Sequence, residues 1–163
     1  MEIGVRLARL EDSEAIRGIY NVEVESSTVT MDIVARSAAE QREWLVARSG
    51  AHAVVVAEHG EGVVGFGSLS SWRDRAGYRT TVEDSVYVDR SAQGLGVGRA
   101  VLVELVDIAR IHGFHAMMAR IAAGHEASRR LHEGLGFRHV GTEHEVGRKF
   151  GRWVDIELLE LLL

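Results

Sequence analysis

The sequence contains no cysteine and no proline. Without cysteine, disulfide bonds, zinc–thiolate sites and a cysteine nucleophile are all excluded. No apolar run approaches the ~18 residues that a membrane-spanning helix requires, and the first residues lack the basic-then-apolar pattern of a signal peptide. These absences are typical of a soluble cytoplasmic protein with no membrane partner, whereas the lack of proline indicates nothing about function.

Basic residues are also scarce: 19 Lys and Arg stand against 24 Asp and Glu, which gives a formal net charge of -5. Proteins that bind nucleic acid normally carry a basic footprint for the phosphates. We therefore expect no nucleic-acid partner. A local basic patch is still compatible with a small phosphorylated cofactor.

The length of 163 residues fits one domain, because a chain near this size buries about 70% of its unfolded surface in a single core. Apolar residues make up 46% and charged residues 26%, as in an ordinary globular domain. We expect a single domain over residues 1–163.

Apolar periodicity predicts the element order β-α-α-β-β-β-α-β-α-β-β. Strands are expected at 3–9, 52–58, 63–69, 82–89, 116–123, 137–146 and 153–163. Helices are expected at 12–24, from the Ser37/Glu40 capping box to Gly50, at 93–113 and at 126–135. Hairpins mixed with helical crossovers predict an α/β fold, α+β in some schemes, whose mixed, mostly antiparallel sheet has helices on both faces.

The sharpest local feature is the glycine-rich segment 89–99, which lies between an expected strand and the longest expected helix. Glycines let a backbone approach a ligand closely, and N–H groups at a helix start attract phosphate oxygens. A pyrophosphate cradle is one interpretation, and a tight turn that needs glycine for its geometry is the other. It is not a P-loop, because Arg99 follows Gly98, and its place past mid-chain disfavours a dinucleotide-binding domain.

The pattern Gln93-x-x-Gly96-x-Gly98 after a strand resembles the acetyl-CoA signature of the GCN5-related N-acetyltransferase (GNAT) superfamily. Further segments resemble its phosphinothricin and methionine sulfoximine acetyltransferase branch, and they cover nearly the whole chain: 19–21, 27–30, 82–88, 131–137 and 146–155. The resemblance implies the GNAT fold and an N-acetyltransferase that uses acetyl-CoA as co-substrate.

The resemblance also implies a set of cofactor-binding residues. The strand segment would hold the pantetheine arm and the thioester, and the turn would wrap the pyrophosphate. At His125 the family commonly has asparagine, so this chain departs from the pattern there. The implied residues are Val86, Tyr87, Val88, Gln93, Gly94, Leu95, Gly96, Val97, Gly98, Arg99, His125 and Ser128.

Transfer to an amine needs a base for the ammonium proton and an acid for the departing thiolate. The resemblance implies Glu83 as the general base and His132 as the residue that protonates the sulfur. The alternatives are a solvent-facing strand carboxylate and a packed or surface histidine.

The charged segment 72–80 resembles the acceptor-binding loop of the branch. Arginine suits an amino-acid carboxylate, because its fork meets two oxygens at once. The expected acceptor-binding residues are Met31, Arg73, Arg75, Tyr78 and Glu83. A solvated charged loop is the alternative.

Eight histidines raise the question of a metal. The pairs His112/His115 and His139/His144 lack carboxylates or cysteines in a known ligand pattern, so we expect no metal site. Direct transfer needs none.

The resemblance implies an acceptor like methionine sulfoximine, methionine sulfone or phosphinothricin. The rival interpretations are an acetyltransferase for another small amine or a protein amino terminus, and a non-catalytic acyl-CoA sensor. The apolar end 156–163 predicts a strand that is central in the sheet or covered by a partner. Relatives in the branch are commonly dimers, so a homodimer is expected.

Overall fold

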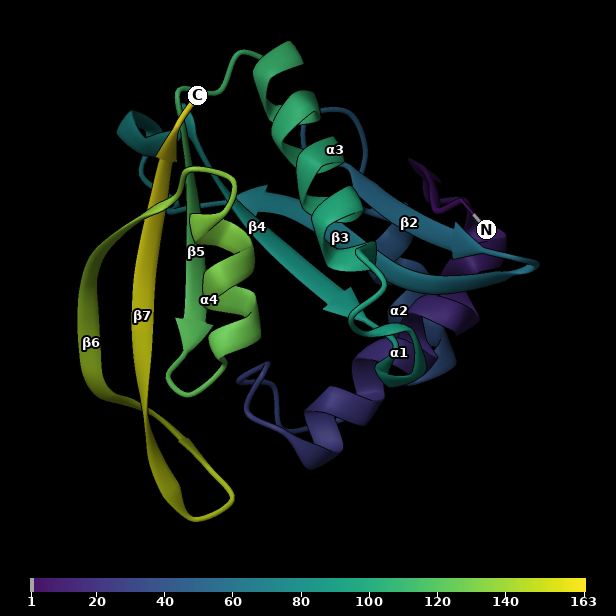
Figure 1. Ribbon diagram of the computed structural model, residues 1–163, viewed down its shortest axis with the longest axis horizontal. Coiled ribbons are helices and arrows are strands. Elements are labelled where there is room, and N and C mark those ends of the chain that lie inside the picture. The colour runs from purple at the N-terminus through teal and green to yellow at the C-terminus, as the bar shows by residue number, and fades with distance from the viewer. Residues whose placement is uncertain (1) are drawn as a thin grey trace.

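The computed structural model describes residues 2–163. Within them, seven strands form one sheet in the order β1-β2-β3-β4-β5-β7-β6 (Figure 1). The strands are β1 (Gly4–Leu7), β2 (Val54–His59), β3 (Gly62–Ser71), β4 (Thr81–Val88), β5 (Ala116–Ala122), β6 (Arg138–Lys149) and β7 (Arg152–Leu162). Only the β4–β5 neighbours among these strands are parallel, which confirms the predicted mixed, mostly antiparallel sheet.

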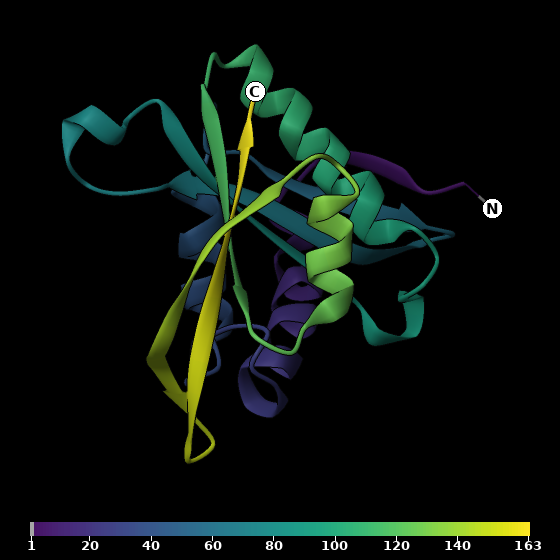
Figure 2. The same cartoon turned by 60° about the vertical axis from the view of Figure 1, so that its left-hand side comes forward.

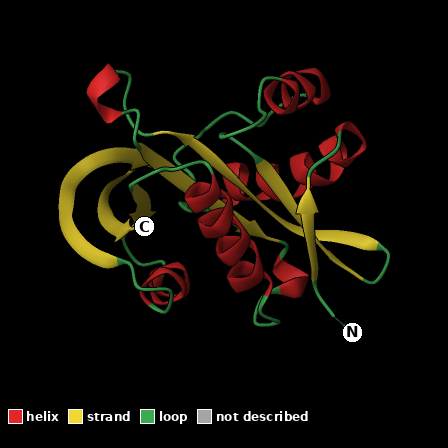
Figure 3. Ribbon diagram, turned by 90° about the horizontal axis from the view of Figure 1, so that it is seen from above, coloured by secondary structure: helices red, strands yellow, loops and turns green. Residues whose placement is uncertain are grey.

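Helices cover both faces of this sheet, as predicted (Figures 2 and 3). The helices are α1 (Ser13–Ser26), α2 (Ala38–Val46), α3 (Val97–Ile111) and α4 (Glu126–Glu133). On one face α3 packs over a core that includes Val55, Val82, Leu102, Leu105 and Met117. On the other, α1 and α2 pack over a core that includes Ile16, Val24, Val56 and Phe66. No helix within residues 2–163 has the length and hydropathy to cross a membrane.

Three predicted boundaries were wrong by about three residues or more, and one short helix was missed. Helix α3 begins at Val97 rather than at 93, because Gly96 has a φ of 87° and caps the helix in the left-handed conformation. Helix α2 already ends at Val46. The charged loop contains a short 3-10 helix, Ala76–Tyr78, and β6 continues to Lys149 because it stays paired with β7.

Strand β7 lies between β5 and β6, so the apolar end of the chain is central in the sheet, the first of its two predicted settings. The neighbouring junction of β4 and β5 is much shorter. These two strands pair only through Thr81–Glu83 and Ala116–Met118, after which β4 turns away while β5 stays paired with β7. Figure 1 shows the two strands diverging toward their carboxyl ends. The sheet is therefore split at its centre.

Candidate active site

A cleft of about 820 Å³ opens where β4 and β5 diverge. Its walls come from residues 84–88 of β4, residues 119–122 of β5, the turn before α3, and the inner side of α4. The volume lies within the range of small-molecule sites in proteins, roughly 300–1,000 Å³. The split in the sheet is thus a site for a ligand of substantial size.

The glycine-rich turn forms one end of the cleft. Gly94 and Gly96 have φ values of 78° and 87°, a region that side-chain-bearing residues rarely adopt. The turn delivers the chain into α3, whose first N–H groups have no acceptor within the helix and carry the positive end of its dipole. The residues of the turn that line the cleft are Gln93, Gly94, Gly96, Val97, Gly98 and Arg99, whereas Leu95 is exposed and does not. This end of the cleft suits an anionic group.

The strand segment Val86, Tyr87 and Val88 forms the long wall of the cleft. It pairs with β3 on one side, through Gly65–Gly67, but the β5 ladder has already ended at Glu83. One edge of β4 is therefore free to pair with an extended ligand chain inside the cleft.

Two further predicted cofactor residues line the cleft from the α4 side. His125 caps α4, and its Nε2 lies 2.8 Å from Thr28 Oγ1 on the loop after α1. Ser128 lies one turn further along α4, and its backbone carbonyl accepts a hydrogen bond from His132 Nδ1 at 2.8 Å. His125 thus ties the start of α4 to the opposite face of the sheet.

His132 lies in the wall of the cleft, but its side chain is buried and both of its ring nitrogens are hydrogen-bonded. Nε2 lies 2.9 Å from Asp84 Oδ1 on β4, and its side chain is 3% exposed. The other oxygen of Asp84, Oδ2, is buried and has no hydrogen-bond partner among residues 2–163. Asp84 also lines the cleft. The pair therefore contains one buried oxygen without a partner, in a residue that lines the cleft.

The protonation of His132 follows from this environment. Burial favours the neutral ring, but the charge of Asp84 and the hydrogen bonds to Asp84 and Ser128 outweigh it, so the pKa of His132 is raised. Because Ser128 O can only accept, Nδ1 carries a proton, and a charged ring also donates from Nε2 to Asp84. Asp84 and Ser128 thus favour the imidazolium form of His132 more than water does.

Glu83 precedes Asp84 and faces the opposite side of β4, as alternation along a strand requires. Arg120 on β5 holds its carboxylate in a fork: Nε lies 2.9 Å from Oε1 and Nη2 lies 2.9 Å from Oε2. The Glu83 side chain is 13% exposed and that of Arg120 is 52% exposed. Arg120 lines the cleft, so the pair lies at the fork where the strands part.

The predicted acceptor-binding residues are only partly brought together. The Arg73 guanidinium lies 5.1 Å from the Trp72 ring and 5.4 Å from the Tyr78 ring, and Arg120 lies 5.5 Å from the same Trp72 ring. These side chains form one cationic and aromatic cluster beside Glu83, which we call the Trp72 cluster.

The other two predicted residues lie apart from the Trp72 cluster. Arg75 is exposed at the start of the short helix in the loop. Met31 packs against Ala122, Val154 and Ile156, a small apolar group on the Glu83 side of the sheet.

Sequence reasoning missed Asp84 and Arg120. Arg120 did carry a signal, because it is the one charged residue in the otherwise apolar strand Ala116–Ala122. A charge in a strand of this kind usually has a partner. Asp84 carried none, since the histidine that pairs with it lies 48 residues away.

Groups of three or more His, Asp or Glu side chains placed to hold a metal ion are not found in residues 2–163. His112 ends α3 and His115 follows the loop, so neither shares a helical face with the other.

Comparison with known proteins agrees with this geometry. Residues 16–137 match the Acetyltransferase (GNAT) family. The chain is 40% identical to the L-amino acid N-acyltransferase MnaT of Escherichia coli over 99% of this chain and 94% of that protein. It is 38% identical to an L-methionine sulfoximine/L-methionine sulfone acetyltransferase of Pseudomonas paraeruginosa, over 100% of this chain and 96% of that protein.

Among solved structures, a GNAT superfamily phosphinothricin acetyltransferase from Sinorhizobium meliloti, in complex with acetyl-CoA, superposes with a TM-score of 0.95. It is 35% identical, and the match covers 100% of this chain and 89% of the other. Fold, glycine-rich turn and full-length similarity agree, and the chain is a member of the acetyltransferase (GNAT) family.

Proposed function

We propose that this protein transfers the acetyl group of acetyl-CoA to the amino group of a small amino-acid-like acceptor. The candidate acceptors are methionine sulfoximine, methionine sulfone and phosphinothricin, the compounds in the names of similar enzymes. The observation that carries the proposal is the open edge of β4 running from Glu83 to the glycine-rich turn.

The residues of the cleft fit acetyl-CoA, which supplies the acetyl group as a thioester. The turn at Gly94 and Gly96, with the start of α3, offers N–H donors and a positive dipole to the pyrophosphate. The free edge of Val86–Val88 offers backbone groups to the amide-containing pantetheine arm. A side chain at Gly98 would place its Cβ 3.2 Å from Leu131 Cδ2, so the wall is closely packed there.

The chemistry we propose is direct transfer within a ternary complex. Glu83 accepts one proton from the acceptor ammonium, and the amine nitrogen bonds to the acetyl carbon. The nitrogen then loses its second proton to solvent, and the carbon–sulfur bond breaks to leave the neutral amide. His132 gives a proton to the departing thiolate and later regains one from solvent, to which Glu83 returns its own. Because both ring nitrogens of His132 are hydrogen-bonded at rest, one of these bonds must open during the transfer.

An acceptor screen tests this proposal and separates it from the rivals. Amino acids, simple amines, and peptides with free amino termini are each incubated with protein and acetyl-CoA, and released CoA thiol is measured. We expect release above the protein-free rate with amino-acid acceptors. Release only with peptides would instead support the amino-terminal acetyltransferase, and acetyl-CoA binding without release with any acceptor would support the sensor.

A further inference from the structure

Glu83, the proposed base, is already paired with Arg120. Both Glu83 oxygens accept charge-assisted hydrogen bonds from Arg120, each at 2.9 Å. If Glu83 took up a proton in this state, the guanidinium would face a neutral acid and the ion pair would be lost. The hydrogen bonds that Arg120 donates to Glu83 raise the pKa of Arg120, so the arginine stays charged throughout. A base in this arrangement needs a replacement partner for Arg120 before it can act.

The backbone explains why the two side chains meet. Glu83 is the last β4 residue paired with β5, opposite Met118, and Arg120 is two residues further along β5. Residues two apart on a strand point to the same face, so Arg120 emerges on the Glu83 side where the sheet splits. Its fork spans the first gap between the strands, and its half-exposed side chain is among those that line the cleft.

Two guanidinium groups, those of Arg120 and Arg73, lie at this point. Both lie against the Trp72 ring. Glu83 pairs with Arg120, and the negative charge of Glu143 also acts on Arg120. Within residues 2–163 Arg73 has no carboxylate within 4.0 Å. Arg120 thus has a carboxylate partner, whereas Arg73, on the same aromatic ring, has none within this distance. An incoming carboxylate is attracted here, and a lone cation is not.

We infer that the α-carboxylate of the acceptor displaces Glu83 from the Arg120 fork, which frees Glu83 to take the ammonium proton. The inference rests on the proposed function. In an α-amino acid one carbon separates the carboxylate from the amine, so a carboxylate on Arg120 brings the ammonium next to Glu83. The exchange conserves the ion pair at Arg120, and it forms a second pair between Glu83 and the ammonium. Arg120 is then a specificity-determining residue for α-amino acids.

An amine without a carboxylate cannot replace Glu83 as the partner of Arg120. Glu83 then stays paired with Arg120 and remains a poor base. We therefore expect a preference for the acid over its amide of about 10- to 100-fold in kcat/KM, the worth of a charge-assisted hydrogen bond. Removal of the guanidinium should have opposite effects on the acid and on the amide. The acid loses its binding partner, while the amide meets a Glu83 that is no longer held.

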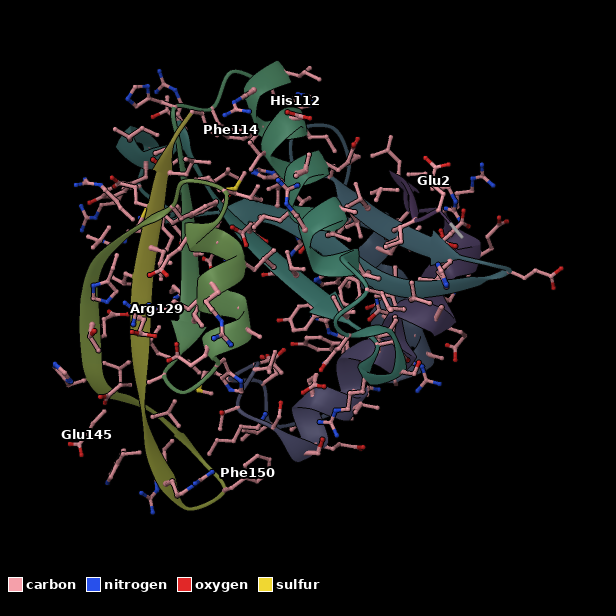
Figure 4. All side chains as sticks on the ribbon, in the orientation of Figure 1. Glu2, His112, Phe114, Arg129, Glu145 and Phe150 are labelled. Carbon is pink, nitrogen blue, oxygen red and sulfur yellow. The ribbon has the colours of Figure 1, made fainter. Side chains whose placement is uncertain are left out.

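The experiment compares L-methionine sulfone with its carboxamide at saturating acetyl-CoA. Variants are Arg120→Met, Arg120→Lys and the matched control Arg129→Met. Arg129 also pairs with a 13% exposed strand glutamate, Glu157, at 2.9 Å, and it lies outside the cleft on the side of α4 facing β7 (Figure 4).

In Arg120→Met we expect kcat/KM for the acid to fall at least tenfold while that for the amide stays level or rises. The control should keep the wild-type ratio. Arg120→Lys keeps the charge but loses the fork, so its ratio should fall between the two. If Arg120→Met does not fold, Arg120→Lys still tests the inference through the same ratio of acid to amide.

Equal losses for acid and amide in both Arg120 variants would overturn the inference, because Arg120 would then act only as a support for Glu83. So would a wild-type enzyme that acetylates the amide as well as the acid, a result that leaves the proposed function standing. If the wild type binds acetyl-CoA in calorimetry but acetylates neither compound, the proposed function fails and the exchange fails with it.

Discussion

Glu83 and Glu157 are closely matched residues. Each is a strand carboxylate whose side chain is 13% exposed, and each pairs with an arginine at 2.9 Å. They differ in place: Glu83 lies where the strands part, and Glu157 lies on β7 away from the cleft. What makes a carboxylate a candidate base here is therefore its position beside the cleft, and comparison of the two separates chemistry from structural support.

At the scale of the residue, we expect Glu83→Gln to lower kcat by ~100- to 10,000-fold at neutral pH, the usual worth of a general base. Acetyl-CoA affinity should change little. Activity should partly recover at alkaline pH, because more of the amine then arrives deprotonated. Steady-state kinetics from neutral to alkaline pH measure this. Glu157→Gln, the matched control, should keep the wild-type rate, and a near-normal kcat in Glu83→Gln would show that Glu83 is not the base.

At the scale of the element, the turn before α3 carries the cofactor claim. Gly96 and Gly113 lie at opposite ends of this helix with φ values of 87° and 77°, and an added Cβ at either would meet nothing within 4 Å. Gln at either position is therefore similarly strained, but only Gly96 lines the cleft.

We expect Gly96→Gln to weaken acetyl-CoA binding by about 10- to 100-fold, because the backbone can no longer approach the phosphates. Gly113→Gln should bind like the wild type while losing similar stability. Calorimetry on both folded variants measures the difference. Equal acetyl-CoA affinities in the two variants would show that the turn at Gly96 does not bind the pyrophosphate.

The Asp84–His132 pair joins β4 to α4, so it links two elements through a buried charge. The pKa of His132 is raised in the fold, which means that the folded protein holds this proton more tightly than the unfolded chain. The stability from the pair is fully present below the unfolded pKa of about 6.5 and is lost as pH rises through the raised folded value.

Asp84→Asn should therefore cost about 1.5–3 kcal/mol near pH 6, and less as pH rises above the raised pKa. Urea unfolding of wild type and variant across this range gives the difference at each pH. The subtraction cancels the other seven histidines, since the sequence has eight in total. A difference that stays constant with pH would mean that His132 does not carry the charge.

At the scale of the molecule, the β6–β7 hairpin combines an edge strand with exposed apolar side chains. β6 is an edge strand of 12 residues, and Val146, Phe150 and Trp153 are 59%, 53% and 60% exposed. Figure 4 shows Phe150 at the hairpin tip. Long edges and exposed apolar side chains of this kind favour pairing with another chain.

We expect a homodimer that buries this hairpin. Trp153→Glu should shift light-scattering masses toward the monomer, whereas Ile111→Glu, at an 82% exposed position at the end of α3, should not. A wild-type monomer at every concentration, or a Trp153→Glu variant that stays dimeric, would contradict the expectation.

The sequence predicted the element order, the mixed sheet and the turn, because hydrophobic periodicity and glycine placement are local. It could not predict the pairs that make the site. Arg120 and Glu83 lie 37 residues apart, and Asp84 and His132 lie 48 apart. Their meeting depends on where β4 leaves β5, a property of the whole sheet. The start of α3 was misplaced for a related reason: Gln93–Gly96 is compatible with either a turn or a first helical turn.

The central claim is that this cleft acetylates amino acids, and product stoichiometry tests it most directly. Purified protein is incubated with acetyl-CoA and L-methionine sulfone, and CoA thiol and N-acetylated amino acid are quantified together by mass spectrometry. We predict that the two appear in equal amounts, that Glu157→Gln matches the wild type, and that Glu83→Gln forms both far more slowly. Thiol release without acetylated amino acid, or no product from a protein that binds acetyl-CoA and this acceptor, would contradict the account.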